Sequence, residues 1–175
     1  ASGYWGDDLG AFRRQLSGGR LDYLTLDFLT EVTMSVLQKQ RARDPDLGYA
    51  VDFLELMRES LPLLEANDTK VITNAGGLNP LGCAEKVAEI AAELKLKIRI
   101  AAVDGDNLMD RLDELLHKGN SLTNLDTRED FSQIRDRVQS ANAYLGSHSI
   151  ARALEEGAEV VVAGRVIDAG MAVAP

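Results

Sequence analysis

The sequence is poor in several residue types, and each shortage narrows the choice of fold and function. Its 175 residues include one cysteine, Cys83, and two histidines, His117 and His148. One cysteine cannot form an internal disulfide, and no cysteine–histidine cluster of the zinc-binding kind is present. No apolar run is long enough to span a bilayer, and the start lacks the basic-then-apolar pattern of a secretory signal. We therefore expect a cytoplasmic protein with no membrane association.

Positive charge is also scarce. The chain has 19 lysines and arginines against 28 aspartates and glutamates, which gives a formal net charge of -9. This balance disfavours nucleic acid and anionic membranes as partners. The hydrophobic content of 45% is that of an ordinary globular protein. A chain of this length can bury a sizeable core, so we expect a single α/β domain over residues 1–175.

The most informative stretch runs from Val71 to Pro80. A short β-branched run meets Gly76-Gly77, and Asn79-Pro80 then begins a helix with apolar residues at helical spacing. Asn79 suits the N-cap, and Pro80 suits the first helical position, where a missing N–H costs nothing. Such a helix start favours a carboxylate or phosphate, although a tight turn that only packs the helix on a sheet explains the same residues. The spacing matches neither common phosphate-loop pattern.

Strand-like and helix-like segments alternate along the chain. We expect strands at residues 21–28, 70–74, 97–103 and 160–163, separated by helices. This alternation predicts a parallel sheet with helices on both faces, a three-layer α/β/α arrangement. The alternative architecture is a β/α barrel. Only part of one would be present, because four or five strands cannot close a barrel.

Three further segments carry structural expectations. Apolar spacing predicts that one helix buries a face made of Leu29, Val32, Thr33, Val36 and Leu37. A helix is also expected to open at Ser132, and the polar stretch 118–130 is expected to be a surface loop, a lid or a small hairpin.

The two ends of the sequence look interrupted. Residues 1–8 resemble the loop that follows a strand, yet no strand precedes them, and Pro175 follows shortly after another strand and loop. We therefore expect a fragment of a longer domain, truncated at both ends. A sheet that lacks its first strand exposes backbone beside apolar side chains, so we also expect a homo-oligomer.

Ligands of parallel α/β folds bind where the strands end, at the carboxyl edge of the sheet. We predict that Asp27 and Asp104 are the catalytic residues at this edge, because neighbouring carboxylates can acquire the shifted pKa that proton transfer needs. The same rule brings Glu31, one turn into the following helix, to this edge. For each single acid, a helix cap or a turn is the more ordinary role, as for Asp106, whereas the acids as a group favour a site. The predicted substrate-binding residues are Tyr4, Trp5, Asn74, Gly76, Gly77, Asn79, Arg165 and Asp168.

Arg165 is the cation of this set, and a planar guanidinium suits a carboxylate or a phosphate. A structural ion pair with Asp168 or Asp104 is its alternative role. The acids could also hold magnesium, but their spacing resembles no fixed ligand set, so we predict no metal site. Cys83 lies in the first turn of the helix that follows Pro80, and its expected role is a small buried residue.

Six runs of sequence together resemble the N-terminal region of the acyclic terpene utilisation (AtuA-like) family. They are Ser2–Asp7, Leu21–Asp27, Glu31–Ser35, Thr73–Pro80, Ser140–Gly146 and Gly164–Ala169. The resemblance covers essentially the whole chain and implies a part in acyclic terpene and branched acyl-CoA catabolism. The resemblance supplies no settled reaction. Our first hypothesis is a hydratase or lyase acting on an acyl-CoA or a branched acid, and the alternative is a non-catalytic partner module of an acyl-CoA carboxylase pathway. The cofactor stays unknown, a CoA-linked substrate being one possibility, and the resemblance supplies no catalytic residue.

Overall fold

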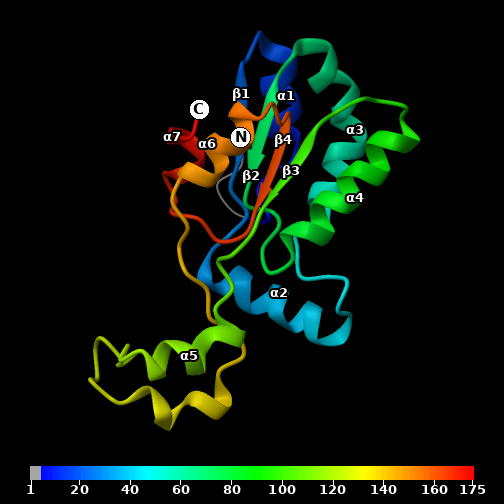
Figure 1. Ribbon diagram of the computed structural model, residues 1–175. Helices are drawn as coiled ribbons and strands as arrows, with labels where there is room; N and C mark the ends of the chain where they lie inside the picture. Colours follow the sequence, from blue (N-terminus) through cyan, green and yellow to red (C-terminus); the bar gives the residue numbers. More distant parts are fainter. Residues whose placement is uncertain (1–4) are drawn as a thin grey trace.

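A computed structural model describes residues 5–175 of the chain (Figure 1). Its strands form one sheet in the order β1-β2-β4-β3, with β1 (Tyr23–Leu26) and β3 (Ile100–Val103) at the edges. The inner strands are β2 (Lys70–Thr73) and β4 (Val160–Ala163). Every pair of neighbours is parallel. The predicted α/β fold with a parallel sheet is therefore confirmed.

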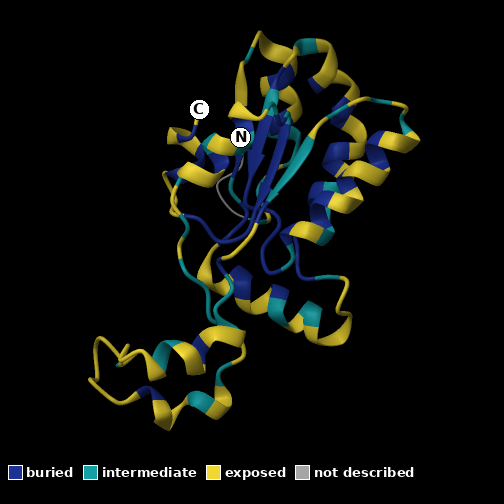
Figure 2. Cartoon of the chain, in the orientation of Figure 1, coloured by how far each residue is buried: buried dark blue, intermediate teal, exposed yellow. Residues whose placement is uncertain are grey.

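Helices cover both faces of this sheet. On one face lie α1 (Gly10–Gly18), α3 (Asp52–Asn67) and α4 (Pro80–Glu93), and on the other lie α6 (His148–Glu155) and α7 (Gly170–Val173). The inner strand β4 consists of three valines and an alanine, all buried (Figure 2). Strands that are buried on both faces of a sheet are typically apolar throughout, and the sequence of β4 follows this pattern.

The helix α2 (Glu31–Arg43) lies beyond the carboxyl edge of the sheet rather than on a face (Figure 1). It buries Thr33, Met34 and Leu37. The prediction that Val32 and Val36 share this buried face is wrong, because they are 74% and 44% exposed. A helix that packs only against strand ends and loops buries a narrow strip, so these two valines face outward.

The turn between β2 and α4 has the local structure that its sequence predicts. Asn79 is the N-cap of α4, and its Oδ1 accepts a hydrogen bond from the Gly82 amide at 3.0 Å. Pro80 occupies the first helical position, so both predictions are confirmed. The Asn79 side chain also donates to the carbonyl oxygen of Asp46 at 3.0 Å, which joins the turn to the loop after α2.

Residues 107–142 form a lobe that leaves the sheet after β3 and returns before α6 (Figure 1). It contains the short helix α5 (Leu112–His117), which the 3₁₀ turn η1 (Met109–Arg111) precedes. The 118–130 stretch is an exposed, polar connection at its tip, as predicted, while its role as a lid stays a prediction.

The helix expected to open at Ser132 is absent from the described chain. Two 3₁₀ turns, η2 (Phe131–Gln133) and η3 (Arg135–Arg137), occupy its place. Short helices need an apolar face to pack against a core, and this segment buries only Phe131. The helix prediction was therefore wrong because the lobe offers too little core to support it.

The sheet edges bear on association of the chain. Among residues 5–175, β1 is an edge strand, but its Leu24 and Leu26 are buried beneath helices. The Val71–Asn74 run is buried as well, and most of it belongs to the inner strand β2. The expected homo-oligomer stays a prediction. No described helix combines the length and the apolar character that a membrane span requires.

Candidate functional site

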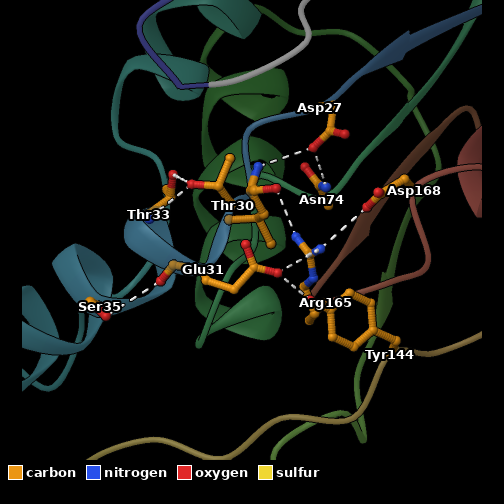
Figure 3. A network of polar contacts seen from close by, with 10 residues as sticks. Asp27, Thr30, Glu31, Thr33, Ser35, Asn74, Tyr144, Arg165 and Asp168 are labelled. Atoms are coloured by element: carbon orange, nitrogen blue, oxygen red, sulfur yellow. Dashed lines mark hydrogen bonds and ion pairs between the residues drawn. The ribbon is translucent and has the colours of Figure 1, made fainter. Parts of the chain in front are cut away.

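The buried guanidinium of Arg165 is the centre of the polar contacts at the carboxyl edge of the sheet (Figure 3). Arg165 follows β4 and is 5% exposed. Its Nη1 donates to the carbonyl oxygen of Leu29 at 2.7 Å, and its Nη2 donates to Asp168 Oδ1 at 3.2 Å. Glu31 Oε1 lies 3.8 Å from the same Nη2. The guanidinium thus joins the segment before α2 to the segment after β4.

Tyr144 closes one side of this arrangement. Its ring centre lies 4.2 Å from the Arg165 guanidinium carbon, within the range of a cation–π contact. Its hydroxyl donates a hydrogen bond to Glu31 Oε1. This hydrogen bond stabilises the charged carboxylate and the neutral phenol. It therefore lowers the pKa of Glu31 and raises the pKa of Tyr144. We call Arg165, Glu31, Tyr144 and Asp168 the Arg165 cluster.

Asp27 and Asn74 lie next to this cluster, at the ends of β1 and β2 (Figure 3). Asn74 is buried, and its Oδ1 accepts from the Phe28 amide at 2.7 Å. Its amide nitrogen donates to Asp27 Oδ1 at 2.7 Å, and the same oxygen accepts from the Leu29 amide at 3.0 Å. Asp27 is therefore held in one orientation at the carboxyl edge, where its sequence position predicts it.

Asp106 does not cap the following helix, although its sequence position suggests that role. It is 1% exposed, and its Oδ2 accepts from the Arg165 amide at 2.9 Å and from Asn142 Nδ2 at 2.8 Å. Burial raises the pKa of its carboxyl group, and the two hydrogen bonds act in the opposite direction. Asn107 supplies the turn before η1 instead, since its Oδ1 accepts from the Met109 amide.

The remaining predicted acids and aromatics are spread more widely. Asp104 follows β3, is exposed, and accepts from the Gly105 amide at 2.6 Å. The indole of Trp5 donates to Asp52 Oδ2 at 2.9 Å, and its backbone amide donates to the carbonyl oxygen of Phe28. Tyr4 lies outside the described residues. The roles predicted for Asp104, Trp5 and Tyr4 stay predictions.

The double glycine has a packing reason for its composition. A Cβ on Gly76 would lie 2.7 Å from the carbonyl oxygen of Ala163, and one on Gly77 would lie 2.3 Å from Leu37 Cδ1. Gly77 also has a positive φ of 51°. The Gly77 amide donates to the carbonyl oxygen of Asn74, within a buried turn. Ligand binding by Gly76, Gly77 and Asn79 stays a prediction.

Metal and thiol chemistry find little support in the described part of the chain. Among residues 5–175, no group of three or more histidine, cysteine, aspartate or glutamate side chains has the geometry to hold a metal ion. Burial raises the pKa of the Cys83 thiol to about 12. Cys83 is thus a buried structural residue, as expected, and a poor nucleophile near neutral pH.

Among residues 5–175, open grooves lie away from the Arg165 cluster. One of about 670 Å³ runs between α1 and the end of α3 and includes Arg20 and Asp68. Another of about 440 Å³ lies between β3 and α6 and includes Arg99 and Arg152. The first lies near the start of β1, opposite the edge where ligands of parallel α/β folds bind. The second runs the length of β3 and reaches Asp104.

The sequence predicts Glu31 at this edge of the sheet without assigning it a role, and it does not predict Tyr144 there. They are 113 residues apart in the sequence, and neither lies at a strand end. The one signal that could have paired them is their place in the runs Glu31–Ser35 and Ser140–Gly146, which carry the family resemblance. Local spacing gives no sign that these two runs meet.

Replacing Tyr144 with phenylalanine is expected to raise the pKa of Glu31 toward its ordinary value of 4.5, because the lost hydroxyl is the largest cause of the shift. A carboxylate with a lowered folded-state pKa stabilises the protein above its unfolded-state pKa, and this contribution is lost as the pH falls through the folded-state value. The variant should therefore lose less stability on acidification. A carbon-13 NMR titration of the Glu31 carboxyl tests this, with Tyr23→Phe as the control. An unchanged midpoint in Tyr144→Phe would show that this hydrogen bond does not form in solution.

Comparison with known families gives a match over the whole chain. The model of the family described as "Acyclic terpene utilisation family protein AtuA" matches residues 1–175. Searches of curated proteins and of solved structures found no match.

Proposed function

The chain belongs to the acyclic terpene utilisation family AtuA, and from this premise we propose that it is an enzyme acting on a branched acid or its CoA thioester. Membership of the family supports a role in acyclic terpene utilisation. The reaction we propose is a hydration, an elimination or a related lyase step. The site of this reaction is the carboxyl edge of the sheet around Arg165.

The observation that carries this proposal is the meeting of separate sequence runs at one place. Glu31 comes from the run at 31–35, Asn74 from 73–80, Tyr144 from 140–146, and Arg165 with Asp168 from 164–169. Asp27 adds the run at 21–27. These runs, which carry the family resemblance, approach one another around a single buried cation. A common site for one ligand accounts for this better than independent structural roles would.

Arg165 is the group that we expect to receive the negative charge of the substrate. Its Nη1 is committed to the Leu29 carbonyl oxygen, whereas Glu31 faces Nη2 at 3.8 Å, beyond hydrogen-bond distance. The side chains of Glu31 and Asp168 are 78% and 82% exposed. An incoming carboxylate can therefore replace Glu31 opposite Nη2. Because Glu31 Oε1 also accepts the hydrogen bond from the Tyr144 hydroxyl, this displacement moves or breaks that bond.

The proton transfers are assigned to Asp27 or Asp104. In the hydration direction, a carboxylate accepts a proton from water as the water oxygen bonds to the β-carbon of an enoyl thioester. The α-carbon then takes up a proton, so that one water is added overall. Positioned acid–base groups of this kind contribute about 100-fold or more to a rate. Trp5 and Tyr4 would form the wall against the apolar part of the substrate.

The test is turnover of a β-methyl-branched enoyl-CoA thioester, followed by mass spectrometry for the gain of one water. The variants Asp27→Asn and Asp104→Asn separate the two candidate groups, and one of them should lower kcat by about 100-fold. The control is Asp22→Asn, an exposed acid just before β1 at the opposite edge. Intact turnover in both variants would refute the assignment. No turnover by the unaltered protein, in either direction, would refute the reaction class.

A second function, as a non-catalytic partner of an acyl-CoA carboxylase, draws support from the lobe at 107–142. It exposes Leu122, Leu125 and Ile134, and Leu125 is 81% exposed. We propose that these side chains form one apolar surface, because contiguous apolar patches often mark a protein interface. Sedimentation velocity with a purified carboxylase subunit tests this, since Leu125→Asp should abolish a complex that Leu63→Asp, changed on α3, leaves intact.

A further inference from the structure

The lobe and the Arg165 cluster are joined through one buried carboxylate. Asp106 stands where the chain leaves β3 for the lobe, and Asn142 stands where the chain returns. The Asp106 carboxylate accepts from Asn142 Nδ2 and from the Arg165 amide through the same oxygen. The carbonyl oxygen of Asp106 also accepts from the Ala143 amide at 2.7 Å. Both ends of the lobe are thus tied to the Arg165 segment at Asp106.

The Asp106 carboxylate is closely packed on one side. A Cβ on Gly164 would lie 2.4 Å from Asp106 Oδ1, so the carboxylate rests directly on the Gly164 backbone. Asp106 is nearly inaccessible to solvent, and an ionisable group is rarely buried so fully unless its hydrogen bonds are needed. The proposed reaction does not use it, because it lies beneath the Arg165 backbone rather than beside the guanidinium.

The segment after Asn142 continues along Arg165 and delivers Tyr144. The Leu145 amide donates to the carbonyl oxygen of Arg165 at 3.1 Å, and the Ile167 amide donates to the carbonyl oxygen of Leu145 at 2.9 Å. Tyr144 therefore lies between two anchors, the Asp106 contacts on one side and the Leu145 contacts on the other. Its ring reaches the Arg165 guanidinium from this fixed segment.

We infer that Asp106 is a positioning residue that sets the Tyr144 ring over the Arg165 guanidinium by tying the returning end of the lobe to the Arg165 backbone. This inference deepens the proposed function and rests on Arg165 as the acid-binding group. It has the consequence that the lobe and the ligand site are coupled. A displacement of the returning end of the lobe moves Tyr144, which also holds Glu31 beside Arg165.

The test is the side-chain Nε–H signal of Arg165 in a proton–nitrogen NMR spectrum of the whole chain. The ring current of Tyr144 should shift this signal upfield. The variant Tyr144→Leu has no ring, so the difference between its signal and that of the unaltered protein measures the shift. Asn142→Ala deletes the side-chain bond from the lobe to Asp106, and Asp106→Ala removes the oxygen that accepts from both Asn142 and the Arg165 amide. Both variants should lose most of the upfield shift. The control, Asp104→Asn, changes an exposed acid two residues away and should keep it.

The hydrogen-exchange rate of the Ala143 amide is a second measurement that requires no ligand. The Ala143 amide should exchange roughly fivefold faster in Asn142→Ala, the equivalent of one lost hydrogen bond. If Asn142→Ala and Asp106→Ala both keep the Arg165 shift and the exchange rates of the control, the inference is overturned. A titration with isovalerate, expected to bind several-fold more weakly to Asn142→Ala, tests the coupling. If the unaltered protein binds no isovalerate, the proposed acid site fails, and the NMR comparison still decides the role of Asp106.

Discussion

Replacing Arg165 with methionine is expected to abolish binding of a branched carboxylate such as isovalerate and to lower the free energy of unfolding by about 2–3 kcal/mol. The guanidinium is buried, and methionine fills its space without a donor. The carbonyl oxygen of Leu29 then loses its 2.7 Å partner, and Glu31 and Asp168 lose the cation that faces them. Calorimetric titration with isovalerate and urea denaturation measure the two effects separately.

The matched control for this change is Arg152→Met. Arg152 also faces two carboxylates, Glu155 and Glu156, but its side chain is 71% exposed. Exposed ion pairs contribute about 0–1 kcal/mol, so this variant should unfold like the unaltered protein and bind isovalerate equally well. Unchanged affinity in Arg165→Met would refute Arg165 as the anion-binding group. Equal loss of stability in both variants would show that the buried contacts of Arg165 carry no special weight.

Replacing Gly76 with alanine is expected to lower the free energy of unfolding by about 3 kcal/mol, the upper end of the usual cost of overpacking. The added methyl group would lie 2.7 Å from the carbonyl oxygen of Ala163 and 2.7 Å from Pro80 Cα. Both atoms belong to backbone, one in β4 and one in the first turn of α4, so neither can move aside by a rotamer change. The turn and the strand must separate instead.

Gly18 supplies the control for this prediction. It ends α1, and a methyl group there would meet no atom within 4 Å. Gly18→Ala should be neutral or up to about 1 kcal/mol stabilising, because alanine loses less backbone entropy on folding. Denaturation by urea measures both variants. If Gly76→Ala unfolds at the same concentration as Gly18→Ala, the close packing of this turn is not present in solution.

The parts of the structure that could be predicted are those that local sequence controls. The alternation of strands and helices predicted the parallel sheet, and the pair Asn79-Pro80 predicted the start of α4. The rule that ligands bind at strand ends selected Asp27, Asn74, Arg165 and Asp168, which lie beside one another. Each of these predictions rests on local sequence alone: the spacing of apolar residues, a helix-capping residue, or the position at which a strand ends.

The parts that could not be predicted depend on contacts between distant segments. Val32 and Val36 have helical spacing, but α2 covers the end of the sheet and leaves them exposed. Asp106 has the sequence position of a helix cap, and only the approach of Asn142 and Arg165 reveals its role. The bond between Glu31 and Tyr144 likewise joins residues that no periodicity relates. Tertiary packing decides these features, and it overrides local pattern.

The most direct test of the proposed site is a crystal structure of the chain grown with isovaleryl-CoA. The account predicts that the acyl group lies at the carboxyl edge of the sheet, with an oxygen of the ligand within hydrogen-bond distance of Arg165 Nη2 and with Glu31 displaced from its place 3.8 Å away. Ligand density in the groove between β3 and α6, with the Arg165 cluster unchanged, would contradict it.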